Sequence, residues 1–514
     1  MAKIIKKIVR VLLIITGVLI MVSLTLFLLL QTPRIQTFTV GKITKVIADK
    51  TGGEIRIGRV SYSIWHEIIL NDILFMDLRG DTLLAAERLD VRLREIKPRK
   101  NIYRFGRVDI YKPDFRMMQD TAGVMNLTEY FGKLKKEGER DTTKRIEVSI
   151  ADVDIFDGSL VLQNASDTAG VVPGRVNFGK MHIKQINTKV RDLYINPDSV
   201  SLAIRGLGFT ESGGFIGRSV DMNLAVHGSN LYFREINIIT DSSAISAEKV
   251  LLMPGDTSSW RDFVTEVRMD VLLNNSVINT SDLAYFVVPL AGINERVALS
   301  GRVSGTVAEL KGRNIRADYE SSTRLRFDFD ISGLPVLNDS YLFIDFNDMR
   351  TSASDIERFS IPGKKPIRLP AIAHDMGIIS YKGSFTGFTT DFVSFGKLTT
   401  ERGTFATDLS LRPDGRNTFG FKGSIRTSDV DLGYITRNEE MFGGLWMHAD
   451  LEGSMESFRR LSATISGVVD SVEINKYLYR NINVSGTYAD RVWDGNVRVK
   501  EPNIEMDLMG RFDL

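Results

Sequence analysis

The chain has 514 residues, with 66 lysines and arginines against 64 aspartates and glutamates, and no cysteine. Its first 48 residues hold seven cations and no acid, so the other 466 hold 59 cations against 64 acids. A slightly acidic body argues against nucleic-acid binding, which depends on Lys and Arg contacts to phosphate. The lack of cysteine excludes disulfides, thiolate catalysis and cysteine–zinc sites.

Residues 11–30 contain no charge and are long enough, as a helix, to span the roughly 30 Å hydrocarbon core of a bilayer. No A-x-A pattern follows Leu30, so a retained transmembrane helix is favoured over a cleaved signal peptide. Its two ends are formed by Val11, Leu12, Leu13, Leu28, Leu29 and Leu30. Four cations precede it and predict a cytoplasmic tail over residues 1–10: Lys3, Lys6, Lys7 and Arg10. Residues 31–514 are then expected outside the cytoplasm.

Residues 31–52 are expected to form an amphipathic helix. Pro33 suits the first helical position, and Gly52-Gly53 ends the pattern. Ile35, Phe38 and Ile43 contribute to an apolar face. Such a helix could cap the first strands or lie at the membrane surface.

From residue 53 onward the apolar positions alternate with polar ones, which predicts strands with one apolar and one solvated face. The clearest segment, residues 324–331, alternates without an error. Short helices are expected at residues 126–134 and 281–288. The sequence has no strict repeat, only a loose recurrence of strand, glycine and strand.

The apolar faces of these strands need a partner, because few helices are available to cover them. A set of β-sandwiches with dry cores is one solution. The other is a single twisted sheet bent into a trough, in which roughly twenty-five strands would extend on the order of 100 Å. Periodicity alone does not choose between them.

No catalytic or metal site emerges. The five histidines are scattered, and each is expected to be at the surface or hydrogen-bonded. The carboxylate pairs Asp152/Asp154, Asp328/Asp330 and Asp429/Asp431 have the period of a solvated strand face, so they are not expected to form an acid pair in a cleft. Residues 213–219 depart from the P-loop spacing and are expected to form a turn. No cofactor is expected.

Several segments resemble TamB-type proteins of the AsmA-like group, in particular the Bacteroidota branch. The segments are Gln31-Thr32-Pro33, Gly58-Arg59-Val60-Ser61-Tyr62, residues 80–89, 123–127 and 281–286, and Tyr477-Leu478-Tyr479-Arg480-Asn481-Ile482. They span nearly the whole chain, although none is a catalytic signature. Family members are usually longer and carry a C-terminal domain that contacts their partner, so this chain is expected to be an N-terminal portion.

The resemblance implies a mainly β fold: an N-terminal transmembrane helix followed by an elongated, twisted trough over residues 53–514, with a few short helices. It further implies a single-pass inner-membrane protein with its body in the periplasm. The expected role is outer-membrane biogenesis, by carrying phospholipid along an apolar groove or by assisting protein assembly with a TamA-like barrel partner. The expected groove residues are Leu325, Phe327, Phe329, Ile331, Phe419, Phe421, Ile504, Met506 and Leu508.

Two other classes remain open from the sequence. A membrane-tethered structural or adhesive β protein with closed cores would share the anchor and the alternation. An anchored hydrolase would need a site that the sequence does not display.

Overall fold

The computed structural model describes most of the chain after residue 53. The described residues are Gly17, Met21, 54–63, 67–121, 123–126, 147–196, 199–255, 259, 262–287, 290–359, 367–369, 371–414, 418–457, 460–489 and 492–513. Gly17 and Met21 are helical, but the rest of the expected anchor and the expected helix over residues 31–52 lie outside these ranges. Within them, no helix combines the length and the apolar character needed to cross a bilayer.

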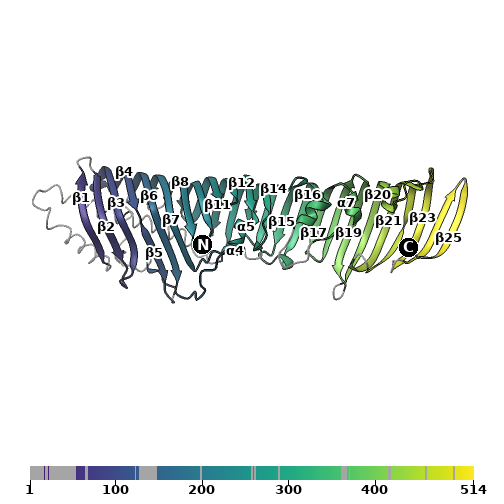
Figure 1. Cartoon of the computed structure of the whole chain (residues 1–514), viewed down its shortest axis with the longest axis horizontal. Helices are drawn as coiled ribbons and strands as arrows, with labels where there is room; N and C mark the ends of the chain where they lie inside the picture. Colours follow the sequence, from purple (N-terminus) through teal and green to yellow (C-terminus); the bar gives the residue numbers. More distant parts are fainter. Residues whose placement is uncertain are drawn as a thin grey trace, which may run out of the picture. The chain divides into compact units, whose positions relative to one another are not determined.

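The described part is mainly β, and its 25 strands belong to one large sheet (Figure 1). A single sheet rules out a row of separate β-sandwiches, each of which would need two packed sheets. The chain divides into two compact units, residues 1–295 (unit 1) and 296–514 (unit 2).

Unit 1 contains twelve strands, in chain order. They are β1 Ile55–Ser63, β2 Glu67–Met76, β3 Thr82–Lys97, β4 Ile102–Tyr111, β5 Asp114–Gln119, β6 Glu147–Asn164, β7 Lys180–Ile195, β8 Ser199–Glu211, β9 Ile216–His227, β10 Asn230–Thr240, β11 Ala244–Pro254 and β12 Val267–Asn279. Its short helices are η1 Pro98–Lys100, α4 Phe263–Glu266 and α5 Thr280–Ala284.

Neighbouring strands of unit 1 pair antiparallel, except that β4 and β5 both run parallel to β6. A parallel pair needs a long crossover, and residues 120–146 supply it. Of the helix expected at residues 126–134, Asn126 is helical and the rest lies outside the described residues. The helix expected at residues 281–288 is the single turn α5. Of the turn expected at residues 213–219, residues 213–215 connect β8 and β9, whereas residues 216–219 belong to β9.

Strands β1–β7 enclose a dry core. Phe75, Leu89 and Phe105 are at most 2% exposed, and they belong to a continuous cluster of buried side chains. Burial of this kind supplies most of the folding free energy of an ordinary domain.

The pair Asp152/Asp154 was expected on a solvated strand face, but Asp154 is nearly buried. Asp90, Asp109 and Asp154 lie opposite one another on β3, β4 and β6 and are nearly buried. Arginines bridge them: Arg107 lies 3.1 Å and Arg191 2.7 Å from Asp154. The carboxylates are buried because long guanidinium side chains cover and neutralise them.

Unit 2 contains thirteen strands in an antiparallel meander. They are β13 Arg296–Gly305, β14 Glu309–Tyr319, β15 Thr323–Ser332, β16 Tyr341–Ser352, β17 Ile378–Gly387, β18 Phe392–Thr400, β19 Gly403–Pro413, β20 Phe419–Asp431, β21 Phe442–Ser457, β22 Arg460–Ile474, β23 Tyr477–Ala489, β24 Val492–Glu501 and β25 Ile504–Asp513. Its short helices are η3 Leu337–Asp339, α6 Ala353–Arg358, α7 Ala371–Asp375 and α8 Leu432–Thr436.

A contact that the sequence did not reveal recurs at every fourth strand. After β12, β16 and β20, and at the end of β24, a carboxylate binds the hairpin that lies two strands earlier. Asp282 accepts hydrogen bonds from Thr240 and Ser243, and Asp355 from Ser322 and Thr323. In the later two copies, Asp431 pairs with Arg402 and Glu501 accepts from Tyr477. The sheet therefore has a four-strand period that is fixed by polar contacts rather than by a repeated sequence.

Candidate functional site

One face of unit 2 carries uninterrupted apolar rows that run across the strands. Residues directly opposite on paired strands share a face, so the register of each pair extends the row to the next strand. One row passes through Leu325, Met349, Tyr381, Leu398, Phe405, Thr427, Met447, Val469, Ile482, Val499 and Met506. The next passes through Phe327, Phe346, Gly383, Gly396, Thr407, Ile425, Ala449, Gly467, Val484, Val497 and Leu508.

Two further rows pass through Phe329 and Leu409, and through Ile331 and Phe421. None of the four rows contains a charged residue from β15 to β25. We call these four rows the apolar lane. All nine residues that the sequence singled out lie on this face, with Phe419 and Ile504 just beyond the rows.

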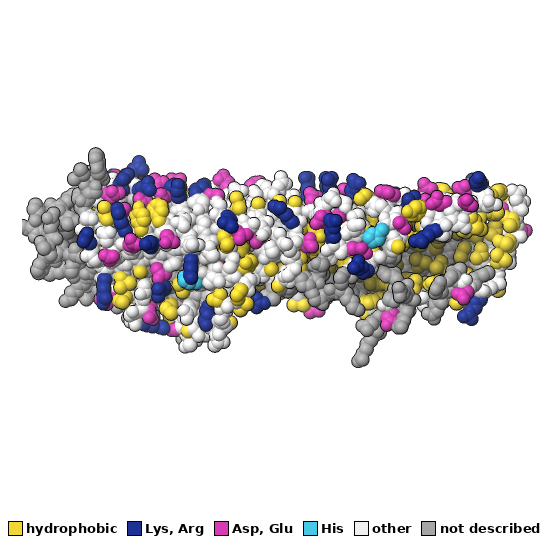
Figure 2. Space-filling view, viewed as in Figure 1, with side chains coloured by type: hydrophobic (Ala, Val, Ile, Leu, Met, Phe, Trp, Pro, Cys, Tyr) yellow, Lys and Arg dark blue, Asp and Glu magenta, His cyan; other side chains and the backbone are white. Residues whose placement is uncertain are grey.

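Much of the lane is not sealed like the core of unit 1, although Ile482 and Val499 on β23 and β24 are buried. Leu325, Phe329 and Phe421 are half-buried, and Leu508 is 43% exposed. Figure 2 shows a hollowed, largely hydrophobic surface over the C-terminal strands, with charged side chains along its border. The lane therefore offers apolar area that the described part of the chain leaves uncovered.

Aromatic rings and glycines alternate within the lane. The Phe327 ring centroid lies 5.8 Å from that of Phe346, which lies 5.9 Å from that of Tyr381. Rings cover the neighbouring glycines closely: a Cβ on Gly486 would lie 2.5 Å from the Trp493 indole. Glycine at these positions lets the rings lie flat on the backbone, which smooths the surface.

Three polar side chains of the lane have partners within the protein. The Tyr381 hydroxyl lies 3.0 Å from the Ser394 hydroxyl, and the Thr427 hydroxyl accepts a hydrogen bond from the Met447 amide. An apolar ligand that covered these three groups would not leave them unpaired.

The opposite face of unit 2 is charged. Lys422 pairs with Glu452 at 2.9 Å, and Arg498 with Asp507 at 2.7 Å. A hollow of about 1060 Å³ on this face is lined by polar and charged side chains, among them Lys382, Lys397, Arg426, His448 and Asp450. Lane residues such as Tyr381, Ile425 and Ala449 also contribute to its lining, so this hollow lies behind the lane on the same strands.

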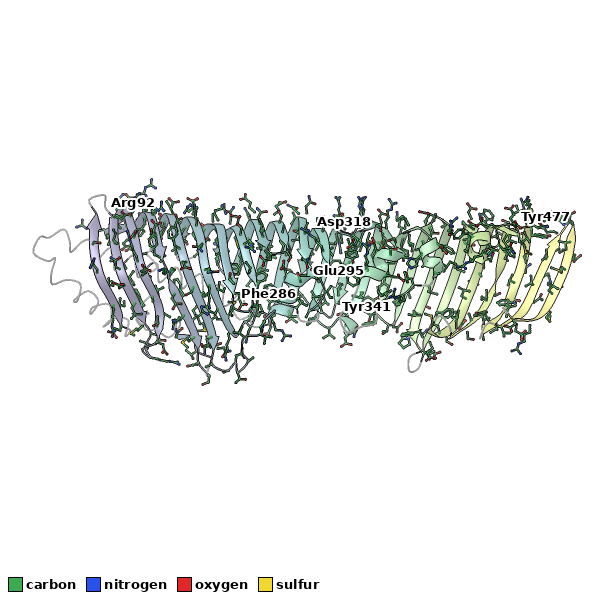
Figure 3. All side chains as sticks on the ribbon, viewed as in Figure 1. Arg92, Phe286, Glu295, Asp318, Tyr341 and Tyr477 are labelled. Atoms are coloured by element: carbon green, nitrogen blue, oxygen red, sulfur yellow. The ribbon has the colours of Figure 1, made fainter. Side chains whose placement is uncertain are left out.

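The two borders of unit 2 differ. One border, which includes Tyr477, carries α6, α7, α8 and the four-strand carboxylates, whereas the border that includes Tyr341 consists of hairpins (Figure 3). Leu432 of α8 packs against Val472 and its cluster on the apolar face, so this helix overhangs the lane. We call the two borders the helix rim and the hairpin rim.

Asp355 fixes α6 to the helix rim. Burial opposes ionisation of this side chain, but the hydrogen bonds that Ser322 and Thr323 donate outweigh burial and hold the pKa of Asp355 below its ordinary value. The Ser322 hydroxyl lies 2.5 Å from the carboxylate, and the Ser352 side chain caps the same helix. An ionised carboxylate with several donors is a strong anchor.

Acid–base and metal chemistry find little support in the described ranges. They contain no cluster of three or more His, Asp or Glu side chains suited to a metal ion. His374 lies 3.3 Å from Glu357 and His448 3.2 Å from Asp470, both as exposed pairs, as expected for hydrogen-bonded surface histidines.

Comparison with known proteins adds no identity. No family model, no curated protein and no solved structure matches the chain.

Proposed function

We propose that the chain is an inner-membrane-anchored bridge that carries phospholipid along the apolar lane. In this proposal the mainly β body is a trough in the periplasm, and acyl chains lie on the lane while headgroups remain in water. No chemical step is involved.

The observation that carries the proposal is a charge-free, half-buried apolar face that continues over eleven strands, β15–β25. An acyl chain crossing water loses about 0.8 kcal/mol for each exposed CH₂, so transfer needs continuous cover. A uniform lane would shield the acyl chain along its whole path without binding it strongly at any one position.

The resemblance to TamB-type proteins and the charge-free segment at residues 11–30 support the location and the place in outer-membrane biogenesis. Assistance to outer-membrane protein assembly and secretion, with a TamA-like barrel partner, rests on the resemblance alone and stays a prediction.

The alternative is a membrane-tethered structural or adhesive protein with closed cores. The dry core of β1–β7 fits this alternative, but it gives no account of the uncovered apolar area of unit 2. The lane therefore favours the lipid proposal.

Photo-crosslinking in the full-length protein within its own membranes tests the proposal. A benzophenone amino acid would replace Phe327, Phe421 or Leu508 on the lane, and Arg326, Ser424 or Met509 as matched positions on the opposite face. Mass spectrometry should find phospholipid adducts at the first three positions and not at the second three. Equal labelling of both faces, or no lipid adduct on the lane, would contradict the proposal.

A further inference from the structure

The hairpin rim of unit 2 is apolar at one place. Residues 332–344 and 383–396 each contain a single charged residue, Asp339 and Asp391 respectively. They form the connections β15–β16 and β17–β18 with the adjoining halves of these strands. Seven exposed apolar side chains project there: Val336, Leu337, Tyr341, Phe343, Phe388, Val393 and Phe395. We call them the rim patch.

The rim patch borders the lane. Leu342, Gly387 and Phe392 are opposite one another and belong to the outermost lane row. Phe388 follows Gly387 in the connection, whereas Tyr341 and Val393, next to Leu342 and Phe392 along their strands, point to the other face. The Phe385 and Phe392 rings lie 4.6 Å apart within the lane, and the Tyr341 and Phe388 rings 5.5 Å apart beyond it.

At Gly387 the wall of the lane has no side chain. Its φ of +135° favours glycine, and a Cβ there would clash with the Asp391 carbonyl oxygen and Phe392. The outermost lane row therefore has a gap between the side chains of Leu342 and Phe392.

The patch then turns onto the charged face. Phe343 and Val393 both lie opposite Thr386 on β17, and Phe395 on β18 is 65% exposed. Large aromatic side chains this exposed on an otherwise charged face indicate a contact surface.

Other described places on the border carry charged side chains. The next hairpin carries Arg412 and Asp414, both exposed. The helix rim carries Arg358 paired with Glu320 at 2.9 Å and Arg402 paired with Asp431 at 3.3 Å. An acyl chain that crossed the border at either place would leave its apolar contacts next to hydrated charges.

We infer that the rim patch is a lateral portal through which the acyl chains of a membrane phospholipid enter or leave the lane. We assign an acyl chain rather than a protein as the occupant, because the patch adjoins the lane at Gly387 and no charged residue lies between them. This inference rests on the proposed function and adds the place of loading.

The test uses the full-length protein reconstituted in vesicles, with donor vesicles of phosphatidylcholine that contain a fluorescent phosphatidylcholine. A double variant, Tyr341→Asp with Phe388→Asp, places charges at the portal. Leu478→Asp is the matched control, because Leu478 is similarly exposed in the β22–β23 hairpin of the helix rim. The portal variant should take up fluorescent lipid about tenfold or more slowly, with unchanged final occupancy. The control should match the wild type.

Equal uptake rates for the portal variant and the control would overturn the portal and leave the lane intact. A wild type that never acquires fluorescent lipid would overturn both. A change from dimer to monomer with unchanged uptake would identify the patch as a contact between copies, and this also overturns the portal.

A second measurement does not depend on how the charged variant folds. A benzophenone amino acid at position 388, close in shape to phenylalanine, should capture fluorescent lipid during uptake, whereas the same group at position 478 should not. Capture at 478 alone, or at neither position, would overturn the portal.

Discussion

Phe421→Asp is the sharpest perturbation of the lane. Phe421 lies between Leu411 and Gly453 on the neighbouring strands and is half-buried. A Phe side chain buries about 150–250 Å² when fully covered, so roughly 100 Å² remains for a bound acyl chain. At about 25 cal/mol per Å², this contact contributes about 2.5 kcal/mol, or roughly a sixtyfold change in affinity. A carboxylate under an acyl chain adds a desolvation penalty.

The assay is the phospholipid retained per chain, measured by mass spectrometry of lipid extracted from purified full-length protein. We expect Phe421→Asp to retain at least tenfold less lipid than the wild type. Phe421→Leu keeps the apolar contact, and Ser424→Asp places the same charge on the opposite face of β20, so both should retain nearly normal amounts. The reasoning is refuted if Phe421→Asp folds, judged by circular dichroism, and retains as much lipid as Ser424→Asp.

Three further substitutions test the architecture by denaturant unfolding. Phe75→Ala in the dry core should lower the free energy of unfolding by about 3–5 kcal/mol. Phe329→Ala in the half-buried lane should lower it by about half as much. Equal losses would mean that the lane is a closed core. Gly423→Ala should be destabilising by about 1–3 kcal/mol, because its Cβ would clash with the Asp408 carbonyl oxygen. Gly420→Ala on the same strand, with its nearest contact at 3.6 Å, should be nearly neutral. Similar values for the two would contradict the close packing. Asp355→Asn should lower stability by about 2 kcal/mol at neutral pH, with exposed Asp375→Asn as the control. The depressed pKa of Asp355 gives a stabilisation that is present above the ordinary pKa of 3.8 and is lost as pH falls through the lower folded value. The difference between wild type and Asp355→Asn should therefore shrink on acidification, and a constant difference would exclude this origin.

The sequence was sufficient to predict the strands and the shared face of the nine expected groove residues, because alternation over segments such as 324–331 fixes which side chains point together. It also predicted roughly the right number of strands. Alternation does not reveal which strands pair, so the choice between one sheet and several sandwiches needed the register of β13–β25.

Long-range polar contacts were beyond the reach of the sequence. Asp154 has the spacing of a solvated residue, but Arg107 and Arg191 from other strands cover it. Asp282 and Asp355 each bind hydroxyls more than thirty residues earlier, and Arg402 takes the place of hydroxyls at Asp431. Because different side chains perform the same task in each copy, the four-strand period leaves no repeated motif.

The placement of polar contacts bears on how the lane could conduct lipid. In unit 2 the contacts that cap α6 and α8 lie at the helix rim, so they do not interrupt the rows between β15 and β25. Inside the lane, the hydroxyls of Tyr381 and Ser394 are paired with each other, and no position in the four rows offers a bound lipid a charge. A ligand on such a surface gains similar free energy at each strand, because apolar contact scales with area rather than with specific partners. The same uniformity that leaves the site without a signature motif would allow a lipid to move from strand to strand without a deep minimum.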